Sequence, residues 1–450
     1  MKIRSIKSRW LYISASAIAA IALIGGASFA QSKKTTNQQV VPAPVHYWAD
    51  ISNGGSLMGF GMPSLPFGMG KSNNNNWSDA YHGMPGKHAD LTINHNSFPN
   101  QIKASQAVPS NAGLGKAINL LPTTPTKSTT QPPEEVQNPI DRYKLEKKDF
   151  KISFYWGCGA TAKAGQPKFI QIKDGKIINN GFNMQHRGDT PWPQNNEAYS
   201  RWPNAKDNRG FGGNASLSGN HKISGANIPA SLSFNIAAAQ DFMDDLKISS
   251  TGDKSGIISL SWNNDQVAKA YFFSAFGMSG NKNELVIWTS ADVPDDGSGL
   301  FNYLSADKIN QYLKEKALLP ASQNKCDVPK GIFANSDMVM VRGIAYGPDT
   351  YLVYPERPKD PAVTWVQEWT AQIRNKSLGM HMVGMSGMMM GGASTAGMTE
   401  EQKRQAKCDA AKNKSGNVGS AIGSALGGGV GGLIGGAVGK KKATENPDCN

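Results

Sequence analysis

The fold class follows from one stretch, Gly256-Ile257-Ile258-Ser259-Leu260-Ser261-Trp262, which is rich in the β-branched and aromatic residues that strands favour. Runs of the same kind follow at 269–276 and 284–289. The later run 338–354 is divided by the turn sequence Gly347-Pro348-Asp349, which predicts a hairpin. These runs together predict a mainly β protein.

Similar strands are expected on either side of this centre. Residues 151–156 are aromatic and β-branched, and residues 169–172 form a second run that ends at Asp174-Gly175. This dipeptide favours a tight turn, so residues 176–178 are expected to return as a hairpin partner. Near the end of the region, residues 369–374 alternate apolar and polar side chains, which indicates a strand with one buried face.

A single helix is predicted among the strands. Ser305 is a suitable N-cap and Pro320 a suitable stop, so the helix is expected over 306–319, with Ile309 and Tyr312 on the side that packs on the sheet. Many short strands with one helix are typical of an antiparallel β-sandwich. The predicted architecture is therefore a mainly β antiparallel sandwich with one inserted helix, flanked by low-complexity arms and a Gly-periodic tail.

The residues at 257–288 also resemble a known family. A Trp-bearing strand at 258–263 is followed by a strand that carries Tyr271 and by the strand Leu285-Val286-Ile287-Trp288. This order is similar to the first half of a fibronectin type III domain, in which the Trp and Tyr are core residues. The resemblance implies a sandwich of that kind and no activity, and the helix at 306–319 departs from the family pattern.

The overall composition excludes several classes of protein. The chain has 450 residues, of which 49 are Gly and 25 Pro, and only 18% are charged. This mixture excludes a long coiled coil, and the absence of a three-residue glycine period excludes collagen. A hydrophobic content of 39% is too high for disorder throughout.

Shifts in composition divide the chain into segments. The predicted segments are a signal peptide (1–30), a Gly/Met/Asn-rich arm with one or two short strands (31–121), a Pro-rich linker (122–147), a β-rich globular region (148–375), a Met/Gly-rich linker (376–398), a polar helix (399–413) and a glycine-rich tail (414–450). The polar helix is expected because Thr399 to Gln402 forms a capping box.

The first thirty residues have the features of a secretory signal. A basic start is followed by the apolar stretch Leu11 to Ile24, and small residues precede a cleavage point before Gln31. An uncleaved anchor is the alternative. We therefore expect export to the periplasm or outer envelope of a bacterium. Without these thirty residues the net charge falls from +13 to +9, and a basic excess in an exported chain favours anionic lipid, glycan or wall polymer as partner. No nucleic-acid-binding pattern is present.

The four cysteines suit an oxidising compartment. An even number of cysteines in an exported chain predicts two disulfides, and three pairings are conceivable. We expect Cys158 to pair with Cys326 in the globular region and Cys408 with Cys449 in the tail. Free buried thiols are the alternative.

Glycine recurs in the tail at a strict spacing of four. The residues concerned are Gly419, Gly423, Gly427, Gly431, Gly435 and Gly439. This spacing would place them along one side of a helix, where they allow another helix to approach closely. The stretch resembles the glycine-zipper segments of bacterial envelope proteins, which implies membrane contact or self-association. A membrane span, a hairpin that dips into the membrane and a flexible linker all remain open.

Methionine gathers in the two glycine-rich arms. Five residues of the second arm are candidate metal ligands, namely Met380, His381, Met382, Met385 and Met388. Thioether sulfur is a soft ligand suited to Cu(I). A flexible arm that adheres to a membrane or a partner is the alternative, so no cofactor is expected unless copper binds there.

Searches for catalytic motifs give little. The chain has no phosphate-binding loop, no HExxH and no GxSxG, and no residue is assigned a catalytic role. We therefore expect an envelope-associated binding or structural protein, whose partner is a membrane or another envelope component and which has a tail suited to self-association. A periplasmic copper-handling protein and a secreted enzyme acting on wall or glycan polymer are the alternatives.

Overall fold

The computed structural model describes residues 38–54, 86–99, 101–122, 149–181, 187, 198–279 and 283–384. The predicted signal peptide, nearly all of the Pro-rich linker, the polar helix and the glycine-rich tail lie outside these ranges. So do Cys408, Cys449, Met385, Met388 and the six tail glycines.

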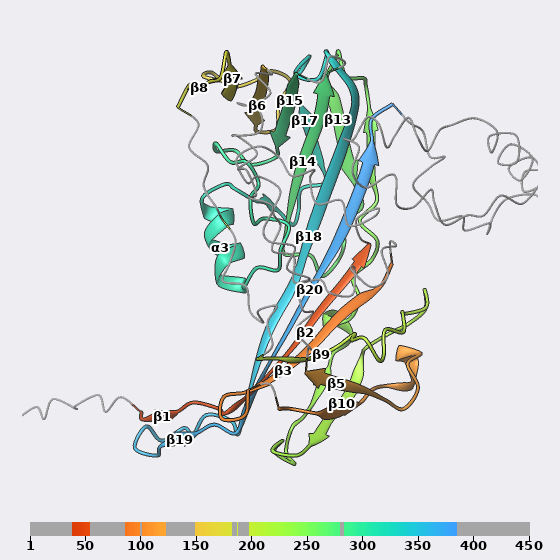
Figure 1. Cartoon of the computed structure of the whole chain (residues 1–450), viewed down its shortest axis with the longest axis vertical. Coiled ribbons are helices and arrows are strands. Elements are labelled where there is room, and N and C mark those ends of the chain that lie inside the picture. The colour runs from red at the N-terminus through yellow and green to blue at the C-terminus, as the bar shows by residue number, and fades with distance from the viewer. Residues whose placement is uncertain are drawn as a thin grey trace, which may run out of the picture.

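One large mixed sheet dominates the described part of the chain (Figure 1). From edge to edge its strands are β11 (Ser233–Ile236), β10 (Gly219–Gly225), β4 (Ala104–Ala107), β5 (Ala117–Pro122), β9 (Ser200–Trp202), β3 (His88–His95), β2 (Val45–Gly54), β20 (Trp369–Met382), β18 (Ser336–Tyr354), β14 (Ala270–Ser279), β15 (Glu284–Thr289), β6 (Phe150–Trp156), β7 (Lys168–Lys173) and β8 (Lys176–Asn179). The short strand β16 (Leu319–Pro320) pairs with β14.

Two smaller sheets and little helix complete the fold. A three-stranded sheet contains β12 (Ile248–Thr251), β13 (Ile258–Trp262) and β17 (Lys325–Val328), and a two-stranded sheet contains β1 (Val40–Val41) and β19 (Trp365–Val366). The α-helix of the described part is α3 (Ala306–Lys314), and two short 3-10 turns, η3 (Ser110–Ala112) and η4 (Ala238–Gln240), also occur. The prediction of a mainly β protein is confirmed.

Strands β18 and β20 form the central axis of the molecule. They have 19 and 14 residues, and Figure 1 shows them running from one end of the molecule to the other. The predicted hairpin at Gly347-Pro348-Asp349 is wrong, because β18 continues through these residues and its register on β20 shifts between Tyr346 and Asp349. These residues form an irregularity within the long strand and not a turn, because residues of β20 pair with β18 both before and after Gly347-Pro348-Asp349.

Two strand pairs of the large sheet are parallel. Strand β2 runs parallel to β20, and β6 runs parallel to β15. The members of each pair are far apart in the sequence, so no tight turn forces them to be antiparallel. The large sheet is therefore mixed, in contrast to the antiparallel arrangement expected from the sequence.

The N-terminal region is part of this sheet. Residues 31–121 were expected to contain one or two short strands, but strands β1 to β5 all begin within them. Val45, Tyr47, Ala49 and Ile51 of β2 are at most 1% exposed, and β2 lies between β3 and β20. The last part of β20, from Lys376 to Met382, was likewise expected to be linker. Both segments gain order from pairing with distant strands, which local glycine content does not reveal.

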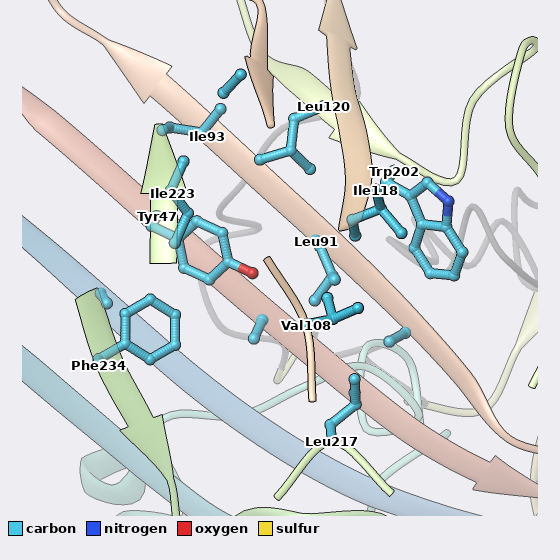
Figure 2. Packing of buried hydrophobic residues seen from close by; sticks show 14 of the residues in the cluster. Tyr47, Leu91, Ile93, Val108, Ile118, Leu120, Trp202, Leu217, Ile223 and Phe234 are labelled. Carbon is cyan, nitrogen blue, oxygen red and sulfur yellow. The ribbon is translucent and has the colours of Figure 1, made fainter. Parts of the chain in front are cut away.

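Two hydrophobic cores lie on one face of the large sheet, one at the lower and one at the upper end as drawn in Figure 1. At the lower end, residues of β2, β3 and β20 pack against β4, β5, β10 and β11, and Figure 2 shows Tyr47, Leu91, Ile223 and Phe234 within this core. At the upper end, the three-stranded sheet covers the same face, with the ring of Trp262 centred 4.2 Å from that of Phe273.

The opposite face is covered by the segment that contains α3. Ser305 caps the helix by accepting a hydrogen bond from the backbone N–H of Lys308, as predicted. Ile309 and Tyr312 of the helix are buried in a core with Phe272 of β14. The helix ends at Lys314, earlier than expected, because Lys316 adopts a left-handed φ of 58° and β16 follows.

A disulfide joins Cys158 to Cys326, which is the pairing predicted for the globular region. Cys158 follows β6 of the large sheet, and Cys326 lies on β17 of the three-stranded sheet. The backbone N–H of Gly159 also donates to the carbonyl of Asp327. The disulfide therefore ties the two sheets together at the upper end of the molecule.

Candidate functional site

The middle of the large sheet buries charged side chains. Asp50 of β2 and Arg374 of β20 are register partners, and Arg374 donates from Nε and Nη2 to the two carboxylate oxygens of Asp50, each over 2.7 Å. Asp90 of β3 lies opposite Asp50, and Lys376 follows Arg374 on the same face of β20. We call Asp50, Asp90, Arg374, Lys376 and Tyr303 the buried ion cluster.

Tyr303 closes this cluster from the segment before α3. The Lys376 ammonium lies 4.2 Å from the centre of the Tyr303 ring, and the Arg374 guanidinium lies 5.1 Å from it. Lys376 also donates to the carbonyl of Phe301 over 3.2 Å. Two cations thus lie close to one aromatic ring, which is favourable in a site removed from water.

Burial sets the electrostatics of the cluster. Burial raises the pKa of Asp50, although the charge and hydrogen bonds of Arg374 oppose this shift. Burial lowers the pKa of Arg374, but Asp50 outweighs it, so the net shift of the Arg374 pKa is upward. Burial raises the pKa of Tyr303 well above its usual value, and the negative charges of Asp50 and Asp90 add to the rise. Such shifts also occur at catalytic sites.

The exposure of the cluster favours a structural role. Arg374 is 5% exposed, and Asp50, Asp90 and Lys376 are at most 1% exposed. A substrate would have to reach groups that the fold already covers. The cluster is therefore best explained as an internal tie between β2, β3, β20 and the segment that precedes α3.

A second internal network lies in the lower core. Tyr47 donates to the side-chain oxygen of Gln106 over 2.9 Å, and the amide nitrogen of Gln106 lies 3.1 Å from Nδ1 of His221. Nε2 of His221 lies 2.7 Å from the carbonyl of Leu217. Burial lowers the pKa of His221, so the ring is neutral at pH 7. The side-chain polar atoms of Tyr47, Gln106 and His221 thus all have partners, which is typical of structural buried networks.

The structure separates the predicted metal ligands. Successive residues of a strand point to opposite faces, so Met380 and Met382 lie on one face of β20 and His381 on the other. Nε2 of His381 lies 2.7 Å from the hydroxyl oxygen of Ser250 on β12, and burial lowers its pKa. Within the described ranges, no group of three or more His, Cys, Asp and Glu residues is suited to hold a metal ion.

Exposed apolar side chains gather near the lower end of β18 and β20. The described part of the chain has nine large hydrophobic residues that are exposed, and five of them gather here: Val40, Val41, Tyr354, Val363 and Val366. We call these five residues the apolar tip. They belong to β1, β19, the end of β18 and the connection between β18 and β19, which project from one end of the large sheet (Figure 1).

Hydrogen bonds hold the apolar tip in place. Strand β1 pairs in parallel with β19, with Val40 opposite Trp365 and Val41 opposite Val366. The side-chain nitrogen of Gln38 lies 3.0 Å from the carbonyl of Val363, and its oxygen accepts a hydrogen bond from Nε of Arg357 over 2.6 Å. The N-terminal segment thus fixes the connection between β18 and β19.

Aromatic rings join the apolar tip to the sheet. Tyr354 stacks on Trp369 with ring centres 5.5 Å apart and planes at 6°. The indole N–H of Trp365 donates to the carbonyl of Pro355 over 2.9 Å, and the Arg357 guanidinium lies 5.7 Å from the Trp365 ring. The tip is therefore an ordered part of the fold that exposes apolar side chains and has an aromatic and a basic residue at its side.

Sequence reasoning missed the apolar tip. The residues that could have indicated it are Val40-Val41 and the run from Val363 to Val366, which lie next to Pro-rich stretches and follow no hydrophobic period. Nothing in the sequence shows that these two segments, more than 300 residues apart, pair with each other.

Comparison with known proteins gives no match: no protein-family model, no curated protein and no solved structure is similar enough to the chain to assign it to a family. In the described ranges, no helix is both long and apolar enough to cross a membrane.

Proposed function

We propose that the chain is an exported, envelope-associated binding protein that contacts a membrane surface through its apolar tip. In this proposal the three-stranded sheet and the upper part of the large sheet form a sandwich-like support. The glycine-rich tail at 414–450 provides a second membrane contact or a means of self-association. The observation that carries the proposal is the gathering of exposed apolar side chains at one end of the fold.

Exposed apolar groups of this kind favour an interaction surface. Isolated exposed hydrophobic residues are common, but a contiguous group usually marks a binding site. The tip residues Val363 and Val366 are 48% and 54% exposed, so further burial of each would contribute about 1 kcal/mol. Trp365 and Arg357 beside them are of the types that favour the boundary between lipid and water.

The position of the tip in the chain favours a membrane as its partner. The apolar stretch Leu11 to Ile24 ends only fourteen residues before Gln38, which is bonded to the tip. If that stretch stays in the membrane as an anchor, the tip is where the chain that leaves the bilayer enters the described fold. If the stretch is cleaved, the tip is still where the mature chain enters the fold.

Vesicle flotation of the full chain tests the proposal. We expect the protein to float with vesicles that contain anionic phospholipid, and Val363→Ser with Val366→Ser to weaken binding about tenfold or more, since two apolar contacts are lost. The matched control is Ile177→Ser with Ile178→Ser on edge strand β8, because these residues are 45% and 42% exposed at the opposite end of the sheet. This control should bind as the unmodified chain does.

Three results would count against the tip. Equal loss of binding in both variants would indicate general adhesion. Unchanged binding in the tip variant, with loss when Gly427 and Gly431 are both replaced by Ile, would assign membrane contact to the tail alone. Tip-dependent dimerisation without vesicle binding, detected by analytical ultracentrifugation, would show that the tip binds a second copy of the chain.

A further inference from the structure

Five methionines lie on one face at the upper end of the large sheet. Met278 lies on β14, Met338 and Met340 lie on β18, and Met380 and Met382 lie on β20. The strand register places Met278 opposite Met338 and Met340 opposite Met382. Residues that are opposite each other, or two apart on one strand, project from the same face. We call this group the methionine face.

Packing on the other side of the sheet confirms this orientation. Gly343 and Gly379 are register partners, and a Cβ atom on either would press against Ile248 of the three-stranded sheet. His381 reaches Ser250 of the same small sheet. Met340, Met380 and Met382 alternate with these residues along β18 and β20, so they point away from the three-stranded sheet.

The methionine face remains accessible. Met338 is 40% exposed, and the other four side chains are partly exposed, although Met278 also packs against the small core beneath β6 and β15. In most strands apolar residues that face the core alternate with polar residues that face water. Methionine is therefore an uncommon residue at an accessible strand position. Five thioethers on three adjacent strands therefore form a chemically unusual surface.

Thioether chemistry limits what such a surface binds tightly. Thioether sulfur is neutral, soft and weakly hydrated, and it suits Cu(I) far better than a hard cation. Directly opposite side chains have Cβ atoms about 5 Å apart, and methionine has three rotatable bonds, so sulfurs from neighbouring positions can converge on one ion. Met340 is central, because Met338 lies two residues away on its strand and Met382 lies opposite.

The positive charge of Arg342 indicates which of the five methionines bind the ion. Arg342 is the register partner of Met380, and its guanidinium stacks 3.6 Å over the Phe301 ring. A cation is therefore less favourable beside Met380 than beside Met338, Met340 and Met382, which lie farther towards the end of the sheet.

We propose that Met338, Met340 and Met382 bind one Cu(I) ion at the upper end of the sheet, with Met278 and Met380 beside them. Of the candidate ligands of the sequence, this site uses Met382 and has Met380 beside it, and Met338 and Met340 of β18 take the place of His381. The site is independent of the apolar tip. The ion binds as Cu(I) and is neither oxidised nor reduced in the process.

Competition between the full chain and a chromophoric Cu(I) chelator, under anaerobic reducing conditions, tests the site. The unmodified chain should withdraw one equivalent of Cu(I). Met340→Leu with Met382→Leu should weaken binding at least tenfold while leaving the unfolding temperature nearly unchanged, since leucine keeps the apolar volume. A matched control is Met243→Leu, because Met243 is buried elsewhere and should not affect binding.

A second variant separates the methionine face from the methionines that follow it in the sequence. Replacement of Met385, Met388, Met389 and Met390 by Leu should leave one tight Cu(I) site. The proposal is overturned if this variant loses the ion while Met340→Leu with Met382→Leu keeps it. It is also overturned if the unmodified chain binds no Cu(I) more tightly than millimolar.

Discussion

The burial of side chains on β18, β20 and their connection differs between the middle and the lower end of these strands. In their middle they bury Arg374 and Lys376 beside Asp50, whereas at their lower end Tyr354 and the connected residues Val363 and Val366 are exposed. The buried charges have partners within the fold. The exposed apolar side chains gather where the described fold covers them only in part, which is why we propose this end as the contact site for an external partner.

The largest expected effect concerns the buried half of this comparison. Arg374→Met should lower the free energy of unfolding by about 3–5 kcal/mol, because it removes the cation that is hydrogen-bonded to the buried Asp50 carboxylate. The measurement is equilibrium unfolding in urea. Addition of Asp50→Leu should restore much of the loss, since both charges are then absent. No recovery in the double variant would mean that the pair has a role beyond mutual neutralisation.

The disulfide offers the next largest effect, at the end of the molecule far from the tip. Cys158→Ser with Cys326→Ser opens a link between residues 168 apart in sequence, so we expect the free energy of unfolding to fall by about 2–4 kcal/mol. Vesicle binding should remain unchanged under conditions in which the variant is folded. A parallel loss of vesicle binding would show that the upper end takes part in membrane contact.

Low pH should lower the free energy of unfolding by a smaller amount than loss of the disulfide. Burial lowers the pKa of His221 below the unfolded-state value, so the unfolded chain takes up a proton that the folded chain refuses. The stabilisation from neutral His221 is complete above about pH 6.5, and it falls by about 1.4 kcal/mol per pH unit below that value until the folded-state pKa is reached. Urea unfolding at pH 7.5 and 5.0 measures the effect.

A variant assigns this pH dependence to its source. His221→Gln keeps hydrogen-bonding groups near Gln106 and Leu217 but does not titrate, so its unfolding midpoint should depend less on pH than that of the unmodified chain. The remaining dependence comes from other titrating groups: burial lowers the pKa of His46, whereas burial raises the pKa of Asp295 to about 6, which acts in the opposite direction. An identical pH dependence in both proteins would contradict the assignment.

The smallest expected change in stability concerns the apolar tip. Gln38→Ala removes the hydrogen bonds to the connection between β18 and β19, and these bonds are partly exposed. Each such bond contributes about 1 kcal/mol or less, so global stability should change little. Amide exchange at 355–366 should nevertheless accelerate. Unchanged exchange there would mean that Gln38 does not hold the tip.

Local patterns predicted much of the fold. The runs at 151–156 and 284–289, the hairpin around Asp174-Gly175 and the Ser305 cap all depend on neighbouring residues, and the structure contains each of them. The pairing of Cys158 with Cys326 was also anticipated. These features follow from propensity, turn chemistry and cysteine count.

Pairing between distant segments could not be predicted in the same way. Strand β2 pairs with β20 across more than 300 residues, and this pairing brings Asp50 to Arg374 and β1 to β19. Strand β18 likewise continues through Gly347-Pro348-Asp349, which in isolation favours a turn, because β18 pairs with β20 on both sides of these residues. The ion cluster and the apolar tip depend on this non-local register, and the methionine face depends on the pairing of β14, β18 and β20. A single sequence contains no local signal for either register.

Hydrogen exchange of the full chain with and without anionic vesicles tests the central claim most directly, because it reports where the membrane contact lies. We predict slower exchange at 38–41 and 354–366 when vesicles are present, and no change at 173–179 on edge strand β8. Protection confined to residues after 398, or equal protection at 173–179, would contradict the assignment of the apolar tip as the membrane-binding surface.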